Sequence, residues 1–256
     1  ADAVSGLASE SSHLALLSVV PRDIAPRSPL IGGADERDPG EDIAEFTRGI
    51  RPRSRPELHF LHVMAPHRPW GRLPSGRPRP VAEDHEVPPA VRQGLRLPRD
   101  RALSRRLWRA HLLQVGYADR LLGRVLDHLR RTGMYDRSLV VVAADHGVSF
   151  RPGAPLRDVT DDNVAGVAPV PLFIKRPGGQ GRGTDPAPAQ SIDVLPTILD
   201  SIGAAAPPGV QGRSLLGKVP AERRPRVLAT SGDEVDTTLE ALLRARRHTL
   251  AVQQRE

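Results

Sequence analysis

The longest regular hydrophobic pattern in the chain lies between Asp100 and Thr132. Apolar residues recur there at the spacing of one helical face, and Gly133 supplies a stop after the last of them. The stripe consists of Leu103, Leu107, Leu112, Val115, Leu122, Val125 and Leu129. The pattern therefore predicts a long amphipathic helix over 100–132.

Three shorter stretches also favour helices. Residues 41–50 place Ile43, Phe46 and Ile50 three and four positions apart. Residues 193–202 begin at Asp193, which is suited to a helix cap. Residues 234–248 are the third predicted helix.

Four apolar runs predict strands, at residues 58–64, 138–144, 171–175 and 226–230. The run Ser-Leu-Val-Val-Val-Ala-Ala at 138–144 is continuous and rich in β-branched residues, which is typical of a strand covered on both faces. We expect residues 58–64 to form a buried strand as well. Strands that alternate with helices predict an α/β fold with helices on the faces of a sheet.

Proline, glycine and charged residues separate these elements. Residues 1–40 show no hydrophobic period and predict an irregular lead-in, and residues 71–99 predict a long surface loop. The domain organisation we expect is a main domain over 41–217 and a strand-helix extension over 218–256.

Composition and charge exclude several kinds of site and partner. The chain has 256 residues, 39% of them hydrophobic, and no cysteine, which excludes disulfides, thiolate metal sites and a catalytic thiol. No apolar run approaches the ~20 residues of a membrane span, and the run at 14–20 lacks the basic flank of a signal peptide. The net charge of +7 favours anionic partners. Because acidic residues are interspersed and no nucleic-acid module appears, we expect no nucleic-acid partner and leave an anionic substrate open.

The strongest candidate for chemistry is Asp145-His146-Gly147, directly after the run at 138–144. In open α/β sheets, ligands bind beyond the carboxyl ends of the strands. A carboxylate and an imidazole side by side can both reach one cation, and Gly147 allows the backbone to turn behind them. Zinc usually needs three or four ligands, so a cap and a loop hydrogen bond remain the alternative for this pair.

His67 follows the predicted strand at 58–64 and lies close to Pro66 and Pro69. It could donate to an anionic ester oxygen or act as an acid or base near neutral pH, or it could bond only to loop carbonyls. His59 and His62 point to opposite faces of that strand, and we interpret both as structural.

Other motifs fail or are absent. The glycine-rich residues 178–183 open no helix and so lack the mechanism of a phosphate-binding loop. No Gly-x-Ser-x-Gly or His-Glu-x-x-His sequence occurs.

A set of motifs in a shared order resembles one known family. Residues 61–70 (Leu-His-Val-Met-Ala-Pro-His-Arg-Pro-Trp) and 73–76 (Leu-Pro-Ser-Gly) are similar to a segment of bacterial, often membrane-anchored, sulfatase-domain proteins of the alkaline phosphatase/sulfatase superfamily. The remaining motifs are 114–119, 140–150, 170–178, 191–200 and 212–216. Together they cover roughly residues 41–217.

The resemblance implies an alkaline phosphatase-like fold, with a mixed, mostly parallel sheet and helices on both faces. It implies a hydrolase of sulfate or phosphate esters at a divalent cation (Ca, Mg, Mn or Zn). Asp145 and His146 match the family's metal pair, and His67 matches a histidine that contacts the ester oxygens. A basic residue after the metal pair often touches the substrate, and Arg157 or Arg151 is the candidate here. Phosphoglycerol-type transfer and non-catalytic anion binding remain alternatives.

The resemblance also implies parts that these residues do not supply. The family's nucleophile and early acidic cluster have no match here, and Asp35 and Glu36 lie too close to the predicted strand at 58–64 to replace that cluster. The chain also begins without methionine. We therefore expect an incomplete domain, inactive as it stands, whose full-length form is located at the cell membrane or outside the cytoplasm.

Overall fold

The computed structural model describes residues 38–79, 91, 96–179, 183–229 and 231–255. The predicted lead-in therefore lies almost wholly outside the described residues, as do Asp35, Glu36, much of the predicted loop at 71–99 and residues 180–182. Helices and two small sheets make up the described part, which is consistent with an α/β fold.

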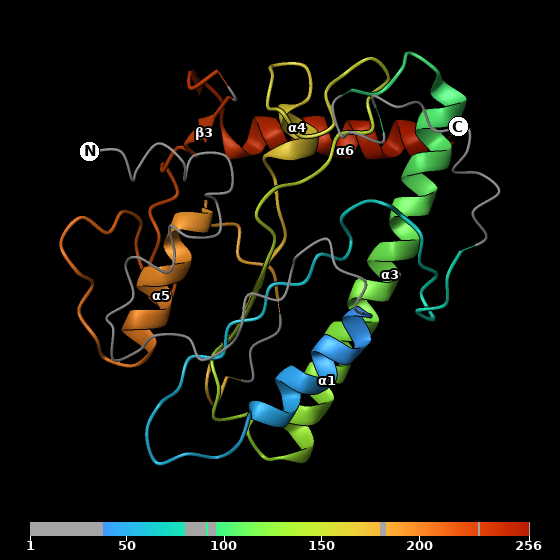
Figure 1. The fold of residues 1–256 in the computed structure, drawn as a ribbon. Coiled ribbons are helices and arrows are strands. Elements are labelled where there is room, and N and C mark those ends of the chain that lie inside the picture. The colour runs from blue at the N-terminus through green and yellow to red at the C-terminus, as the bar shows by residue number, and fades with distance from the viewer. Residues whose placement is uncertain (1–37, 80–90, 92–95, 180–182, 230, 256) are drawn as a thin grey trace, which may run out of the picture.

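The long helix α3 (Arg101–Arg131) confirms the strongest prediction and runs across the molecule (Figure 1). Asp100 caps it, because its side chain accepts a hydrogen bond from the Leu103 amide at 3.0 Å. Gly133, with φ of 68°, provides the left-handed turn after its end.

The buried face of α3 differs from the predicted stripe. Leu112 and Val115 are 45% and 38% exposed. Leu112 lies five positions after Leu107, which rotates it by about 140° away from that side chain. The face that is buried follows steps of three and four and includes small and polar residues: Leu103, Ser104, Leu107, Ala110, Gln114, Tyr117, Leu121 and Leu129.

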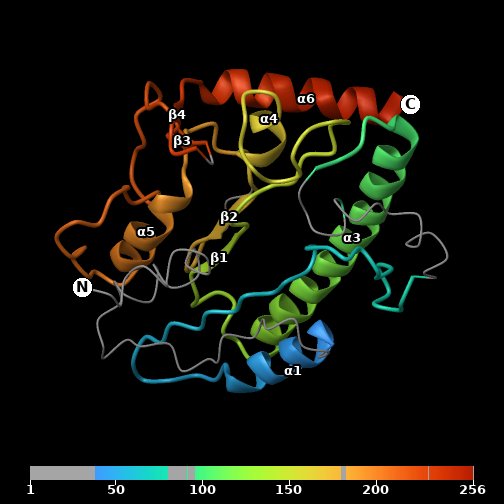
Figure 2. The same ribbon diagram turned by 45° about the horizontal axis from the view of Figure 1, so that its top comes forward.

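Helix α1 (Pro39–Gly49) confirms the predicted helix at 41–50 and lies along one half of α3 (Figures 1 and 2). Ile43 of α1 packs in a core cluster with Tyr117 and Leu121 of α3. At the far end of the pair, the His128 ring of α3 is hydrogen-bonded to the Ile50 carbonyl at 3.1 Å. The two helices therefore form one packed unit.

The two sheets each contain two antiparallel strands. Strand β1 (Val140–Ala143) pairs with β2 (Leu172–Lys175), and β3 (Val227–Leu228) pairs with β4 (Glu234–Val235). The predicted mostly parallel sheet is thus not confirmed in the described residues. The prediction that β1 is covered on both faces is wrong, because its residues are half-buried or exposed and Phe173 opposite Val142 is 65% exposed.

Residues 58–64 form no strand, and the predicted buried strand is wrong there. A strand needs a partner to complete its backbone hydrogen bonds, and no strand of the described residues lies beside this segment. Side chains of this segment nevertheless alternate between core and solvent: Leu61 and Val63 pack against the α1–α3 core, while Phe60 and Met64 are 40% and 42% exposed. The segment carries the chain from α1 to His67.

The remaining helices follow β1 in the chain. The predicted helix at 193–202 is present as a short 3-10 turn (Ser191–Asp193) followed by α5 (Val194–Ser201). The predicted C-terminal helix is α6 (Leu239–Arg255), which starts later than expected and packs on α4 (Val164–Val167) (Figure 2). No helix among the described residues is long and apolar enough to cross a membrane.

Candidate functional site

Asp145 and His146 lie two and three residues beyond the end of β1. The Asp145 carboxylate accepts a hydrogen bond from the His146 amide at 2.9 Å, and its other oxygen lies 3.7 Å from His146 Nε2. The side chains are 58% and 38% exposed. The pair therefore turns both of its potential ligand atoms toward the same accessible space.

The His146 ring is oriented for coordination. Its Nδ1 lies 2.8 Å from the Gly147 carbonyl, and a carbonyl can only accept, so Nδ1 carries the proton and Nε2 presents its lone pair. One cation at about 2.0–2.2 Å from each ligand can bridge atoms as much as ~4 Å apart. The 3.7 Å between Asp145 Oδ2 and His146 Nε2 fits this limit. The pair thus fits a divalent cation, although the described residues contain no group of three His, Cys, Asp or Glu that could hold a metal.

Gly147 is required by a close backbone approach. Its amide donates to the Val167 carbonyl at 2.7 Å. A Cβ at this position would lie 2.5 Å from the Gly166 carbonyl oxygen and 3.0 Å from that of Val167. Only glycine allows the turn behind His146 to press against α4 in this way.

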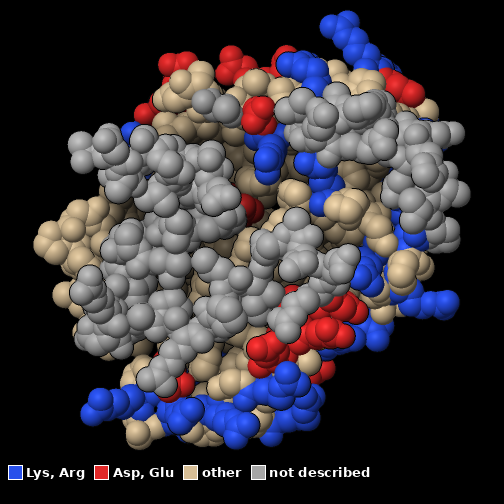
Figure 3. All heavy atoms as spheres, in the orientation of Figure 1, with Lys and Arg blue, Asp and Glu red and all other residues tan. Residues whose placement is uncertain are grey.

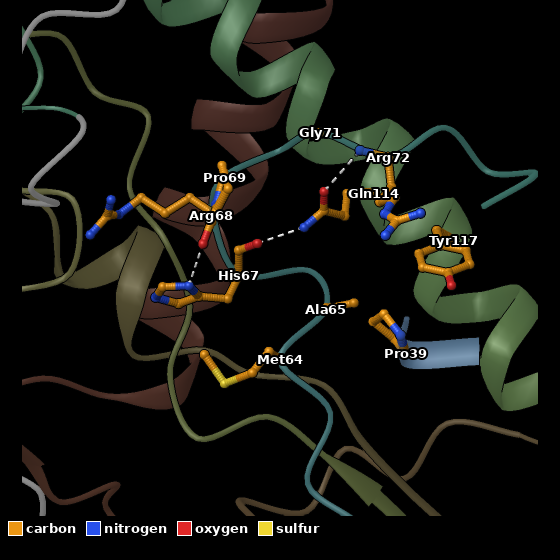
Figure 4. Close-up of a pocket in the computed structure, with 10 residues that line it drawn as sticks. All are labelled: Pro39, Met64, Ala65, His67, Arg68, Pro69, Gly71, Arg72, Gln114 and Tyr117. Carbon is orange, nitrogen blue, oxygen red and sulfur yellow. Dashed lines mark hydrogen bonds between the residues drawn. The ribbon is translucent and has the colours of Figure 1, made fainter. Parts of the chain in front are cut away.

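His67 lies on a second loop that α3 holds in place (Figure 4). The Gln114 amide nitrogen donates to the His67 carbonyl at 2.5 Å, and its oxygen accepts from the Arg72 amide at 3.3 Å. The His67 Nδ1 lies 2.6 Å from the Arg68 carbonyl, so Nδ1 is the protonated nitrogen and Nε2 is left to accept. One buried side chain of α3 thereby fixes both sides of the loop.

The two loops bring positive groups together. Burial lowers the pKa of His67 below its usual value, and the nearby charges of Arg68, Arg157 and His146 lower it further, against the Arg68 carbonyl, which raises it. Burial and the charge of Arg157 also lower the pKa of Arg68. The structure thus places three of the predicted residues, His67, Arg157 and His146, in one electrostatic neighbourhood and adds Arg68 to it. At neutral pH the His67 ring is mostly neutral.

The structure separates the two candidate arginines. The Arg151 guanidinium is bound to Asp162, 3.1 Å from its carboxylate and 2.7 Å from its carbonyl oxygen. Arg157 is exposed, and within the described part of the chain its guanidinium has neither an ion pair nor a hydrogen bond. Arg157 is therefore the arginine that is available to an anion.

A buried aromatic contact joins the two loops. The His111 ring of α3 lies 5.8 Å from the Trp70 ring and 5.3 Å from the Phe150 ring, and these two rings are 5.2 Å apart. Trp70 belongs to the loop of His67, and Phe150 belongs to the loop of His146. Burial lowers the pKa of His111 to about 4, and the charge of Arg246 acts in the same direction against the Pro66 carbonyl. His111 is thus a neutral core group at pH 7.

A cavity of about 240 Å³ opens beside His67 (Figure 4). It lies between this loop, the start of α1 and the middle of α3, and its exposed surface is mostly apolar. Its lining includes Pro39, Met64, Ala65, Pro69 and Tyr117, together with Arg68 and Arg72. The cavity is large enough for a single ring or a short alkyl group.

Sequence reasoning missed three residues of this region. Arg68 follows His67 within the same motif, so its position next to an expected anion site was an available signal. Gln114 interrupts an apolar helical face, and a buried polar residue in such a face indicates a specific partner. His111 gave no signal, because its partners Trp70 and Phe150 are 41 and 39 residues away in sequence.

Comparisons with known proteins agree on one family. A family model described as Sulfatase matches residues 22–204. PehA of Trinickia caryophylli, a multifunctional alkaline phosphatase superfamily protein, is 37% identical over 101 residues, which are 38% of this chain and 19% of the relative. Choline-sulfatase of Rhizobium meliloti is 34% identical over 99 residues, or 39% of this chain and 19% of that protein.

Two further proteins are similar to this chain. Lipoteichoic acid synthase 2 of Bacillus subtilis is 32% identical over 94 residues, which are 34% of this chain and 14% of the relative. The solved structure of a phosphonate monoester hydrolase from Silicibacter pomeroyi is 24% identical, with a TM-score of 0.46, over 89% of this chain and 54% of that chain. The matched residues thus span less than a fifth of each curated relative named here.

Proposed function

The chain belongs to the sulfatase family, and from this premise we propose that it supplies a pair of metal ligands and an anion-binding group to a hydrolase of sulfate or phosphate esters. The observation that carries the proposal is the meeting of two loops at one place. Asp145 and His146 come from the loop after β1, and His67 and Arg68 come from the loop held by α3. The pattern suits an anionic substrate bound next to a cation.

The metal ligands in this proposal are Asp145, through a carboxylate oxygen, and His146, through Nε2. Bound there, Ca²⁺, Mg²⁺, Mn²⁺ or Zn²⁺ would screen the repulsion between a nucleophile and an anionic ester and would stabilise charge that develops in the displacement. Further metal ligands would come from outside the described residues, since these contain no group of three His, Cys, Asp or Glu that could hold a metal. The family's nucleophile segment has no match in this sequence.

The anion-binding groups in this proposal are Arg157, Arg68 and His67. The exposed Arg157 guanidinium can form a bidentate pair with the ester oxygens. A bound anion would also favour protonation of His67 at Nε2, since Nδ1 is already protonated and bonded to the Arg68 carbonyl. His67 could then donate to an ester oxygen or protonate a leaving alcohol. The nearby cavity would receive a compact apolar alcohol, such as a phenol.

The test is hydrolysis of an aryl sulfate and an aryl phosphodiester by the protein in its longest natural form, with each of the four cations. Asp145→Ala and His146→Ala should lower kcat/KM by more than about 100-fold, because even outer-shell partners of a metal contribute about 10–100-fold. Asp127→Ala and His248→Ala are matched controls, because both residues are exposed and lie on α3 and α6. Unchanged rates in the Asp145 and His146 variants would reject the proposal.

Transfer of a phosphoglycerol group is the second candidate, and the likeness to lipoteichoic acid synthase 2 favours it. The same metal pair and arginine would serve it, because both reactions displace at an anionic centre. Substrate profiling separates the two, since a transferase releases its product only with an alcohol acceptor. If the protein binds phosphate but turns over neither class of ester, a non-catalytic anion-binding role replaces both.

A further inference from the structure

Helix α6 carries a partly buried arginine, Arg246, close to the loop that follows β1 and carries Asp145 and His146, which we call the proposed metal loop. Arg246 lies outside residues 22–204, which the family model matches. Its guanidinium donates to the Gly166 carbonyl at 2.8 Å and lies 3.4 Å from the Ala165 carbonyl, both in α4. Burial lowers the pKa of Arg246. The side chains of Arg244 and Arg247 on the same helix are exposed.

The carbonyl that Arg246 holds is also the surface against which the metal loop turns. The Gly166 oxygen lies 2.5 Å from the place where a Cβ of Gly147 would be, and the Gly147 amide donates to the next carbonyl, that of Val167. A shift of α4 of a few tenths of an ångström would therefore move the backbone that follows Asp145 and His146. Gly166 in turn lies against Ser149, so this contact continues along the same loop.

A second contact leads from Arg246 to the other loop. The charge of Arg246 acts on His111, which packs against both Trp70 of the His67 loop and Phe150 of the His146 loop, two rings that also contact each other. One guanidinium from α6 thus adjoins the supports of both loops.

We propose that Arg246 is a positioning residue for Asp145 and His146. Its hydrogen bond to the Gly166 carbonyl holds α4 in place. Helix α4 in turn holds the backbone turn at Gly147. The inference rests on the proposed function for its consequence, which is metal affinity, but its structural step can be measured without a metal. On this proposal, helix α6 supports the site through Arg246.

The test compares Arg246→Gln with Arg247→Gln in the full chain. Hydrogen exchange of the Gly147 amide, followed by NMR, should accelerate by at least ~10-fold in Arg246→Gln, because a charged hydrogen bond that holds its acceptor helix is lost. Exchange at Leu121, in the middle of α3, should change much less. Arg247→Gln should leave both amides as they are. If Arg246→Gln does not fold, Arg246→Lys provides a milder change that should give a smaller rise at Gly147.

Unchanged exchange at Gly147, or an equal rise at Gly147 and Leu121, would overturn the inference, since the arginine would then contribute nothing or only general stability. Titration with Mn²⁺ provides the second readout, and Arg246→Gln should weaken binding by about 10-fold or more, the range known for residues that orient metal ligands. If the longest natural form of the protein binds no Mn²⁺ while Gly147 exchange still responds to Arg246, the positioning step stands and the proposed metal pair fails.

Discussion

Arg223 holds Asp193 in a buried, two-pronged ion pair. The two guanidinium nitrogens lie 2.6 and 2.9 Å from the two carboxylate oxygens, and the Asp193 side chain is fully buried. The backbone amides of Gln190 and Arg213 donate to the same carboxylate. Asp193 opens α5 within the family motif at 191–200, whereas Arg223 comes from the C-terminal segment, so the pair fastens that segment to the rest of the chain.

We expect Arg223→Gln to lower the free energy of unfolding by about 3–5 kcal/mol, because it leaves a buried carboxylate without its counter-charge. Arg224→Gln is the matched control. Its pair with Asp236 is exposed, with side chains 72% and 90% accessible, and such pairs contribute ~0–1 kcal/mol. Urea unfolding of the two variants measures both values, and equal losses would show that the Arg223 pair contributes no more than a surface contact.

Local sequence patterns were sufficient for the helices. α3 follows from its periodicity, from the Asp100 cap and from Gly133, all of which act within a few residues. The pattern gave the wrong buried face, because apolar character alone favoured Leu112 over Ala110, although only Ala110 lies in the direction of the core. Which face is buried depends on partners that are distant in sequence.

Strands were predicted less well for a related reason. The apolar run at 58–64 has the composition of a strand, but a ladder requires a second segment, and the described residues place none beside it. The candidate site likewise combines residues that are adjacent in sequence with contacts between distant residues. Asp145 and His146 are adjacent in sequence and could be proposed from it, whereas the approach of Arg157 to His67 joins residues 90 positions apart.

The two candidate arginines can be distinguished without any assay of turnover. Because the positive charge of Arg157 lowers the pKa of His67, Arg157→Gln should raise that pKa. Arg151→Gln should leave it unchanged, since the Arg151 guanidinium is paired with Asp162. An NMR titration of the His67 ring in each variant measures the shift. A larger rise in Arg151→Gln would reverse the assignment.

Gly147→Ala adds only one methyl group, but we expect it to disrupt the loop that carries Asp145 and His146. The added methyl group would lie 2.5 Å from the Gly166 oxygen, which is backbone and cannot rotate away. We expect a loss of about 2–4 kcal/mol in unfolding free energy, at the upper end of overpacking costs, and loss of Mn²⁺ binding. Gly123→Ala is the control: the glycine lies in α3 with open space around it, so alanine should stabilise the helix by about 1 kcal/mol. Normal Mn²⁺ affinity in Gly147→Ala would contradict the close packing as a requirement of the site.

His111 should make the stability of the protein depend on pH between about 6.5 and 4. Its pKa falls from 6.5 to about 4 on folding, so the unfolded chain binds the proton more readily throughout this window. The contribution of His111 to stability is therefore fully present above pH 6.5 and declines as the pH falls, by up to about 3 kcal/mol below pH 4.

The variant that tests this prediction is His111→Leu. The Nδ1 atom of His111 is buried and has no hydrogen-bond partner among the described residues, so the substitution should be tolerated at pH 7. Urea unfolding at pH 7, 5.5 and 4.5 should show a shallower decline for His111→Leu than for the unchanged protein, whereas His248→Leu, at an exposed position of α6, should keep the full decline. Parallel declines in all three proteins would contradict this prediction, because they would mean that folding does not lower the pKa of His111.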